Sequence, residues 1–145
     1  MKAKFILTKT FPFEAAHQLK YHDGKCARLH GHSFKLTIVI SGKNTVPELI
    51  REPEVPLNQQ KPAKDPKSNM LLDYGEISAI VKPFVESHLD HHFLNDTLET
   101  ESPTSEYIAS YCFGYLSGEF RKAGVKLKEI RISETCTSEA IYRVK

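Results

Sequence analysis

The stretch HSFKLTIVIS, residues 32–41, constrains the fold more than any other segment, because it is rich in β-branched and aromatic residues. Every second position carries an apolar side chain, namely Phe34, Leu36, Ile38 and Ile40. In an extended chain these side chains share one face. The pattern predicts a β-strand with one buried face that ends at Gly42.

A second strand and a first helix can be placed on either side of this segment. Residues 4–19 alternate more loosely and predict a long strand. A helix is expected to begin after Asp73, a natural N-cap with Glu76 at N3. Its apolar positions recur at helical spacing as far as His88, and Pro83 within it predicts a kink.

A second helix and a final pair of strands complete the chain. Ser102 can cap the helix with Pro103 at its first position, and Gly124 ends it. Residues 127–135 and 139–145 predict two short strands joined by a turn. The order ββααββ predicts an α+β fold, a four-stranded antiparallel sheet with two helices on one face. The other face is free to pack against another subunit.

The length of 145 residues fits a single domain, residues 1–145, that contains one insertion. Five of the eight prolines lie in residues 43–69. Repeated proline excludes a regular helix or a central strand there. We expect a long, exposed surface excursion, and a functional lid is the alternative.

Charge and hydropathy exclude several classes of partner. A formal net charge of +2 at pH 7 is too small to indicate nucleic acid. No apolar run approaches the roughly 20 residues needed to span a bilayer, and the N-terminal stretch is not expected to act as a secretory signal. A cytoplasmic location is expected, and in that reducing compartment the three cysteines are expected to be free thiols.

Three histidines form a candidate metal site. His30 and His32 are two positions apart, so their imidazoles project to the same side of a strand and can converge on one ion. His17 ends the first predicted strand, and a hairpin of the two strands brings it alongside. Three neutral imidazoles leave one tetrahedral position open, which is typical of a catalytic zinc site. The alternative is a pair of exposed polar residues on a strand edge.

The cysteines differ in their surroundings. Cys26 lies in a polar loop close to Lys25 and Arg28. Positive charge and a nearby metal lower the pKa of a thiol, so Cys26 is a candidate reactive thiolate. The alternatives are a fourth metal ligand and a small buried hydrophobe. Cys112 falls on the apolar stripe of the second helix and is expected in the core, and Cys136 is assigned a packing role.

Three acidic or basic residues outside these groups are further candidates. Asp90 precedes His91, and an adjacent carboxylate can orient an imidazole as a general acid or base. A histidine-bearing helix terminus and a second metal site fit these two residues equally well. Glu134 lies where a strand runs into a turn and can accept two N–H donors from the edge of a heterocycle. By itself, an exposed strand-end glutamate is the simpler interpretation.

Six segments resemble, in order, motifs of the 6-pyruvoyl-tetrahydropterin synthase family: FEAAHQL, CARLHGHSF, LLDYGEI, LDHHFLND, PTSE and ETCTSEAIYR. The spacing of three residues between Cys26 and His-Gly-His is similar to that of the bacterial queuosine-pathway branch, the 6-carboxy-5,6,7,8-tetrahydropterin synthases. Residues 43–69 are longer than the turn expected there, which affects the expected loop structure and not the chemistry.

The resemblance implies a fold and a cofactor. The fold is the tunnelling fold (T-fold), in which antiparallel sheets from several subunits join into a barrel. The usual assembly is a homohexamer with active sites between subunits. The cofactor is Zn²⁺, held by His17, His30 and His32.

The resemblance also implies a reaction on 7,8-dihydroneopterin triphosphate. Cys26 would be the proton-abstracting thiolate, Asp90 and His91 of a neighbouring chain the acid/base pair, and Glu134 the pterin anchor. The expected enzyme is a zinc-dependent lyase that makes 6-carboxy-5,6,7,8-tetrahydropterin for queuosine biosynthesis, with loss of triphosphate and acetaldehyde. The alternatives are a 6-pyruvoyl-tetrahydropterin synthase, which stops after triphosphate elimination, and a non-catalytic zinc-stabilised module.

Overall fold

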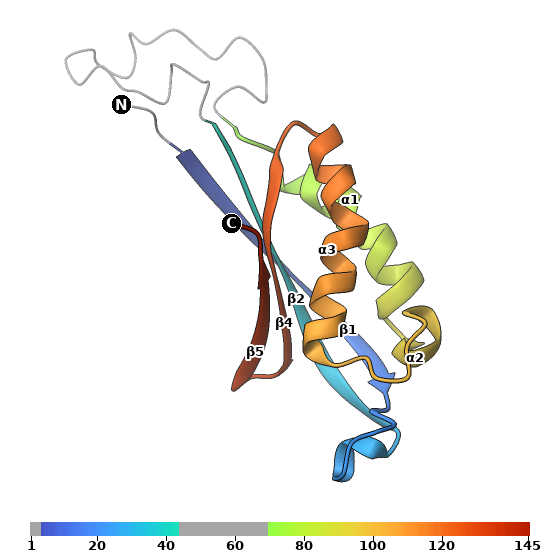
Figure 1. Cartoon of the computed structure of the whole chain (residues 1–145). Coiled ribbons are helices and arrows are strands. Elements are labelled where there is room, and N and C mark those ends of the chain that lie inside the picture. The colour runs from blue at the N-terminus through green and yellow to red at the C-terminus, as the bar shows by residue number, and fades with distance from the viewer. Residues whose placement is uncertain (1–3, 44–69) are drawn as a thin grey trace, which may run out of the picture.

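A computed structural model of the chain describes residues 4–43 and 70–145, so most of the predicted insertion lies outside the described residues. Helices cover one face of a sheet (Figure 1), and the α+β class is as predicted. The sheet has five strands instead of four, in the order β3-β1-β2-β4-β5. β3 (His92–Phe93) runs parallel to β1, so the sheet is mixed. Neither β3 nor α2 (Leu94–Thr97) is long enough to produce a periodic sequence pattern.

The two longest strands form a hairpin that spans the sheet. β1 (Lys4–His17) and β2 (His30–Lys43) have 14 residues each and pair antiparallel along their whole length. Phe13 lies opposite Phe34, and the centroids of their stacked rings are 4.9 Å apart. The remaining antiparallel strands are β4 (Lys126–Thr135), beside β2, and β5 (Ser138–Arg143), beside β4. The histidine-bearing ends of β1 and β2 therefore meet at one end of the sheet.

The first helix begins as predicted and ends in an irregular turn. In α1 (Tyr74–Phe84), the Asp73 carboxylate accepts a hydrogen bond of 2.8 Å from the Gly75 N–H. Pro83 lacks an N–H and cannot donate an α-helical hydrogen bond. The chain continues directly into η4 (Val85–Leu89), a single π-helical turn.

The second long helix, α3 (Ser105–Lys122), begins two residues later than predicted. Its cap is Thr104 and not Ser102, because the Thr104 hydroxyl accepts a hydrogen bond from the Tyr107 N–H. The helix stops before Gly124, as predicted, where φ is +82°. In the part of the chain that the structure describes, neither α3 nor any other helix is long and apolar enough to cross a membrane.

The core lies between the helices and the sheet. The predicted alternating residues of β2 are at most 1% exposed: Phe34, Leu36, Ile38 and Ile40. Cys112 is buried in the same core, as predicted, and burial raises the pKa of its thiol. Cys136 is exposed, so the predicted packing role is wrong. It lies in the turn between β4 and β5.

Candidate metal centre

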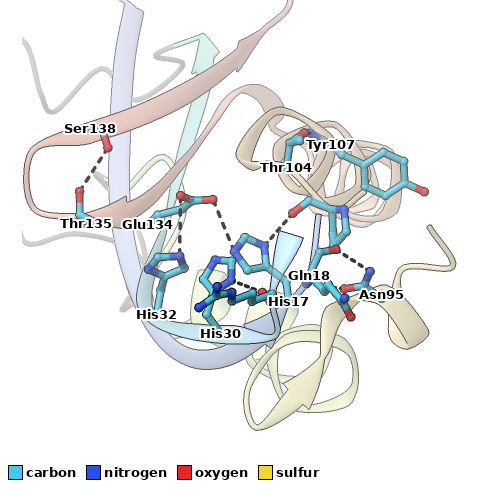
Figure 2. Close-up of polar contacts among 12 residues, drawn as sticks. His17, Gln18, His30, His32, Asn95, Thr104, Tyr107, Glu134, Thr135 and Ser138 are labelled. Atoms are coloured by element: carbon cyan, nitrogen blue, oxygen red, sulfur yellow. Dashed lines mark hydrogen bonds and ion pairs between the residues drawn. The ribbon is translucent and has the colours of Figure 1, made fainter. Parts of the chain in front are cut away.

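The β1–β2 hairpin brings the three predicted histidines together at one end of the sheet (Figure 2). His17 and His30 are directly paired across the strands, and His32, two residues after His30 on β2, is the diagonal neighbour of His17 on the same face. One ligand atom of each histidine lies within 4.8 Å of the other two. Cys26 is not part of this group, which is the only one of its kind among the described residues.

Backbone carbonyls fix the tautomers of two rings. Nδ1 of His17 lies 2.9 Å from the carbonyl oxygen of Pro103, and Nδ1 of His30 lies 2.7 Å from that of Arg28. Because a carbonyl can only accept, each Nδ1 must carry the proton, which leaves the Nε2 lone pair free. Metal-binding histidines typically make such a bond with the ring nitrogen that does not bind the metal. The sequence could not identify these acceptors, since a backbone carbonyl has no residue signature.

Two of the imidazoles present buried nitrogens without a partner. The Nε2 atoms of His17 and His32 are buried and make no hydrogen bond within the described chain. An unsatisfied buried polar group costs about 1–3 kcal/mol, and a metal ion would satisfy both nitrogens. The donor set therefore fits a divalent transition metal, since imidazole suits zinc, copper, iron and nickel.

The electrostatics of His17 also favour a metal. Its side chain is 1% exposed, and this burial lowers its pKa. The neighbouring His30 and His32 lower it further, and these effects outweigh the opposing influence of the Pro103 carbonyl and of Glu134. The lowered pKa favours the neutral imidazole, which is the form that binds a metal.

Glu134, at the end of β4, faces the same space. One carboxylate oxygen lies 3.9 Å from Nε2 of His17 and the other lies 3.9 Å from Nε2 of His32. Both distances are too long for a hydrogen bond. The structure therefore places the predicted substrate anchor beside the two unpartnered nitrogens (Figure 2).

Cys26 lies in the short helix η1 (Lys25–Ala27), within the connection between β1 and β2. Its carbonyl accepts a hydrogen bond of 2.9 Å from the N–H of Leu19, two residues after His17. The side chain is a free thiol of intermediate exposure. The loop is thus held next to the histidine-bearing end of β1.

Asp90 and His91 form the predicted pair, with 3.0 Å between a carboxylate oxygen and Nδ1. The other carboxylate oxygen accepts a hydrogen bond of 2.8 Å from the Glu14 N–H, which lowers the pKa of Asp90. His91 has a left-handed backbone, φ +59°, and its N–H bonds to the Glu14 carbonyl. Non-glycine residues in this region are often functional.

This pair does not belong to the three-histidine group. The His91 side chain is 80% exposed. Within residues 4–43 and 70–145, no hydrogen bond or ion pair joins Asp90 or His91 to the three histidines. His91 lines an open hollow of about 540 Å³ whose other lining residues include Glu14, Ser33 and His32, one of the three histidines.

Comparison with known proteins gives one consistent result. The family model for 6-pyruvoyl tetrahydropterin synthase matches residues 6–145. A 6-carboxy-5,6,7,8-tetrahydropterin synthase from Synechocystis is 40% identical over 139 residues, which are 95% of this chain and 92% of the relative. The Haemophilus influenzae protein of that name is 31% identical and covers 96% and 99% of the two chains.

The fold also has a solved counterpart. The structure of a Caenorhabditis elegans 6-pyruvoyl tetrahydropterin synthase is similar with a TM-score of 0.73 and 22% identity. The similarity covers 99% of this chain and 97% of the other. It supports the predicted T-fold.

Proposed function

Because the chain belongs to the 6-pyruvoyl tetrahydropterin synthase family, we propose that it is a zinc-dependent lyase acting on 7,8-dihydroneopterin triphosphate. The product would be 6-carboxy-5,6,7,8-tetrahydropterin, an intermediate of queuosine biosynthesis, with release of triphosphate and acetaldehyde. Two similar proteins carry the name of this activity. The observation that carries the proposal is the pair of buried, unpartnered Nε2 atoms in the three-histidine group.

His17, His30 and His32 are the proposed zinc ligands. When bound, zinc supplies a Lewis acid that makes protons beside the substrate's side-chain hydroxyls easier to remove. The carbonyls of Pro103 and Arg28 hold two of the rings in the tautomer that this requires. Three imidazoles leave one position for the substrate.

Cys26 is the proposed proton acceptor. Its thiol is free and of intermediate exposure, so a substrate can reach it. Lys25 and Arg28 flank it in the sequence. Its loop is held to the residues that follow His17, which supports a place beside the metal.

The Asp90–His91 pair is proposed to serve the active site of a neighbouring copy. The exposed His91 side chain is available to a second subunit. Among the described strands, β5 has an unpaired edge, and the outer edge of β1 is paired only at Ala15 and Ala16. Such edges readily accept a strand from another chain. We propose a homohexamer with active sites between subunits.

Glu134 is proposed to anchor the pterin ring, and Glu134→Gln tests this role. The variant is expected to keep its metal and to raise KM about 10–100-fold, because a hydrogen bond to a charged group contributes about 1.5–3 kcal/mol. KM and metal content are measured together. Glu139→Gln, at an exposed position of β5, is the control and should change neither. Loss of metal from Glu134→Gln would instead indicate that Glu134 is a metal ligand.

A product assay tests the proposed function. The zinc-loaded protein is incubated with 7,8-dihydroneopterin triphosphate, the pterin product is identified by its mass, and acetaldehyde is measured. The expected result is the carboxy product with acetaldehyde. A pyruvoyl product without acetaldehyde would indicate a 6-pyruvoyl-tetrahydropterin synthase. An unchanged substrate beside a metal-loaded protein would indicate a non-catalytic zinc-stabilised module.

A further inference from the structure

We propose that Gln18 and Asn95 are positioning residues that hold the Cys26 loop against the metal-binding end of β1. The inference rests on the proposed function, since it takes Cys26 as the proton acceptor. Neither side chain belongs to the three-histidine group. Both influence Cys26 only indirectly, through hydrogen bonds to the backbone of residue 18 and of the loop.

Asn95 fixes the residue that follows His17. Its side-chain Oδ1 accepts a hydrogen bond of 2.9 Å from the Gln18 N–H, and its Nδ2 donates one of 2.7 Å to the Gln18 carbonyl (Figure 2). This pairing needs a donor and an acceptor in one plane, which an amide provides and a carboxylate does not. The Asn95 amide thus takes up the hydrogen bonds of the Gln18 backbone, just beyond Ala16, where the pairing of β1 with β3 ends.

Gln18 in turn binds the loop that carries Cys26. Its Nε2 donates a hydrogen bond of 2.8 Å to the carbonyl of Ala27, and the next residue, Leu19, donates to the carbonyl of Cys26. Two consecutive residues after a proposed zinc ligand therefore bind two consecutive carbonyls of η1.

The other end of the loop contacts His30, a second proposed zinc ligand. The Arg28 carbonyl lies 2.7 Å from Nδ1 of His30. The short helix η1 has no side-chain cap at its start. Contacts at both of its ends, with residues next to or within the histidine group, therefore set where Cys26 lies.

The position of Cys26 matters because proton transfer requires a donor and an acceptor within hydrogen-bond reach. A misplacement of about 1 Å can lower the rate of a positioned reaction about 100-fold. Loss of the Gln18–Ala27 bond should thus lower kcat about 10–100-fold. KM and metal content should stay near the wild-type values, since the substrate anchor and the zinc ligands remain in place.

Gln18→Met and Gln18→Arg form the matched pair of variants. Met has a similar length but no donor, whereas Arg keeps a long donor that can reach the Ala27 carbonyl. We expect Gln18→Met to lose kcat and Gln18→Arg to keep at least about a third of it. Asn95→Leu, which removes both bonds to Gln18, should behave like Gln18→Met.

Alkylation of Cys26 by iodoacetamide, followed by peptide mass spectrometry, gives a readout without substrate. A nearby cation changes the thiolate fraction, so the wild-type rate should differ at least about threefold between zinc-loaded and metal-free protein. In Gln18→Met this difference should become smaller while zinc still binds, because the charge interaction weakens with distance. Glu101→Gln is the control, because it weakens contacts to Lys20 and Tyr21 in the same connection but none to Cys26. It should keep the wild-type difference.

Two results would overturn the inference alone: wild-type kcat in Gln18→Met, or no effect of zinc on Cys26 alkylation in the wild type. A failure of the proposed function would look different. In that case the zinc-loaded wild type would leave the substrate unchanged, or Cys26→Ala would retain wild-type turnover, whatever the Gln18 variants do to alkylation.

Discussion

Cys26→Ala is expected to keep its zinc and to lose turnover by about 10²–10⁴-fold, the usual contribution of a positioned acid or base. The thiol is free and lies outside the three-histidine group, so its removal leaves the proposed ligands untouched. Turnover with saturating substrate and metal content by mass spectrometry check the two parts of this prediction.

Cys136→Ala is the control for this experiment. Its thiol is exposed in the turn between β4 and β5, so both turnover and metal content should match the wild type. Normal turnover in Cys26→Ala would refute the role of this thiol. Loss of zinc from Cys26→Ala would indicate that Cys26 is a fourth metal ligand.

His32→Ala is expected to lower zinc affinity by more than about 100-fold, since even a partner of a ligand contributes 10–100-fold. Turnover should fall to background. The metal-free variant should be no less stable than the metal-free wild type, because the substitution removes a buried nitrogen without a partner. Such a nitrogen costs about 1–3 kcal/mol. Zinc titration and thermal unfolding without metal measure these two effects.

His22→Ala is the control for this experiment. It shows whether the removal of any nearby histidine lowers zinc affinity, or only the removal of a ligand. His22 lies in the same connection between β1 and β2, is 42% exposed and is outside the metal group. Its replacement should leave zinc affinity unchanged. Equal affinity in His32→Ala and the wild type would exclude His32 as a ligand.

The sequence predicted the clustering of His17, His30 and His32 because that geometry follows from strand pairing. Alternation along residues 32–41 located β2, and the spacing of His30 and His32 placed both rings on one face. Antiparallel pairing with β1 then required His17 to lie beside them, as the register confirms. These inferences depend only on the alternation of side chains between the two faces of a strand.

The missed features depend on contacts that no local pattern encodes. The start of α3 was misplaced because Thr104 caps it, while the carbonyl of Pro103 bonds to His17 from 86 residues away in the sequence. The contacts of Asn95 with Gln18 join α2 to the end of β1, across 77 residues. Side-chain amides give no periodic signal, so such links appear only in three dimensions.

X-ray absorption at the zinc edge, combined with metal analysis of the purified protein, tests the central claim most directly. We expect about one zinc per chain, with three nitrogen ligands at about 2.0–2.1 Å and no sulfur at about 2.3 Å. The spectrum of His32→Ala should lose this three-nitrogen signature. A protein that takes up no divalent transition metal after loading, or a wild-type site with a sulfur ligand, would contradict a centre built from three imidazoles.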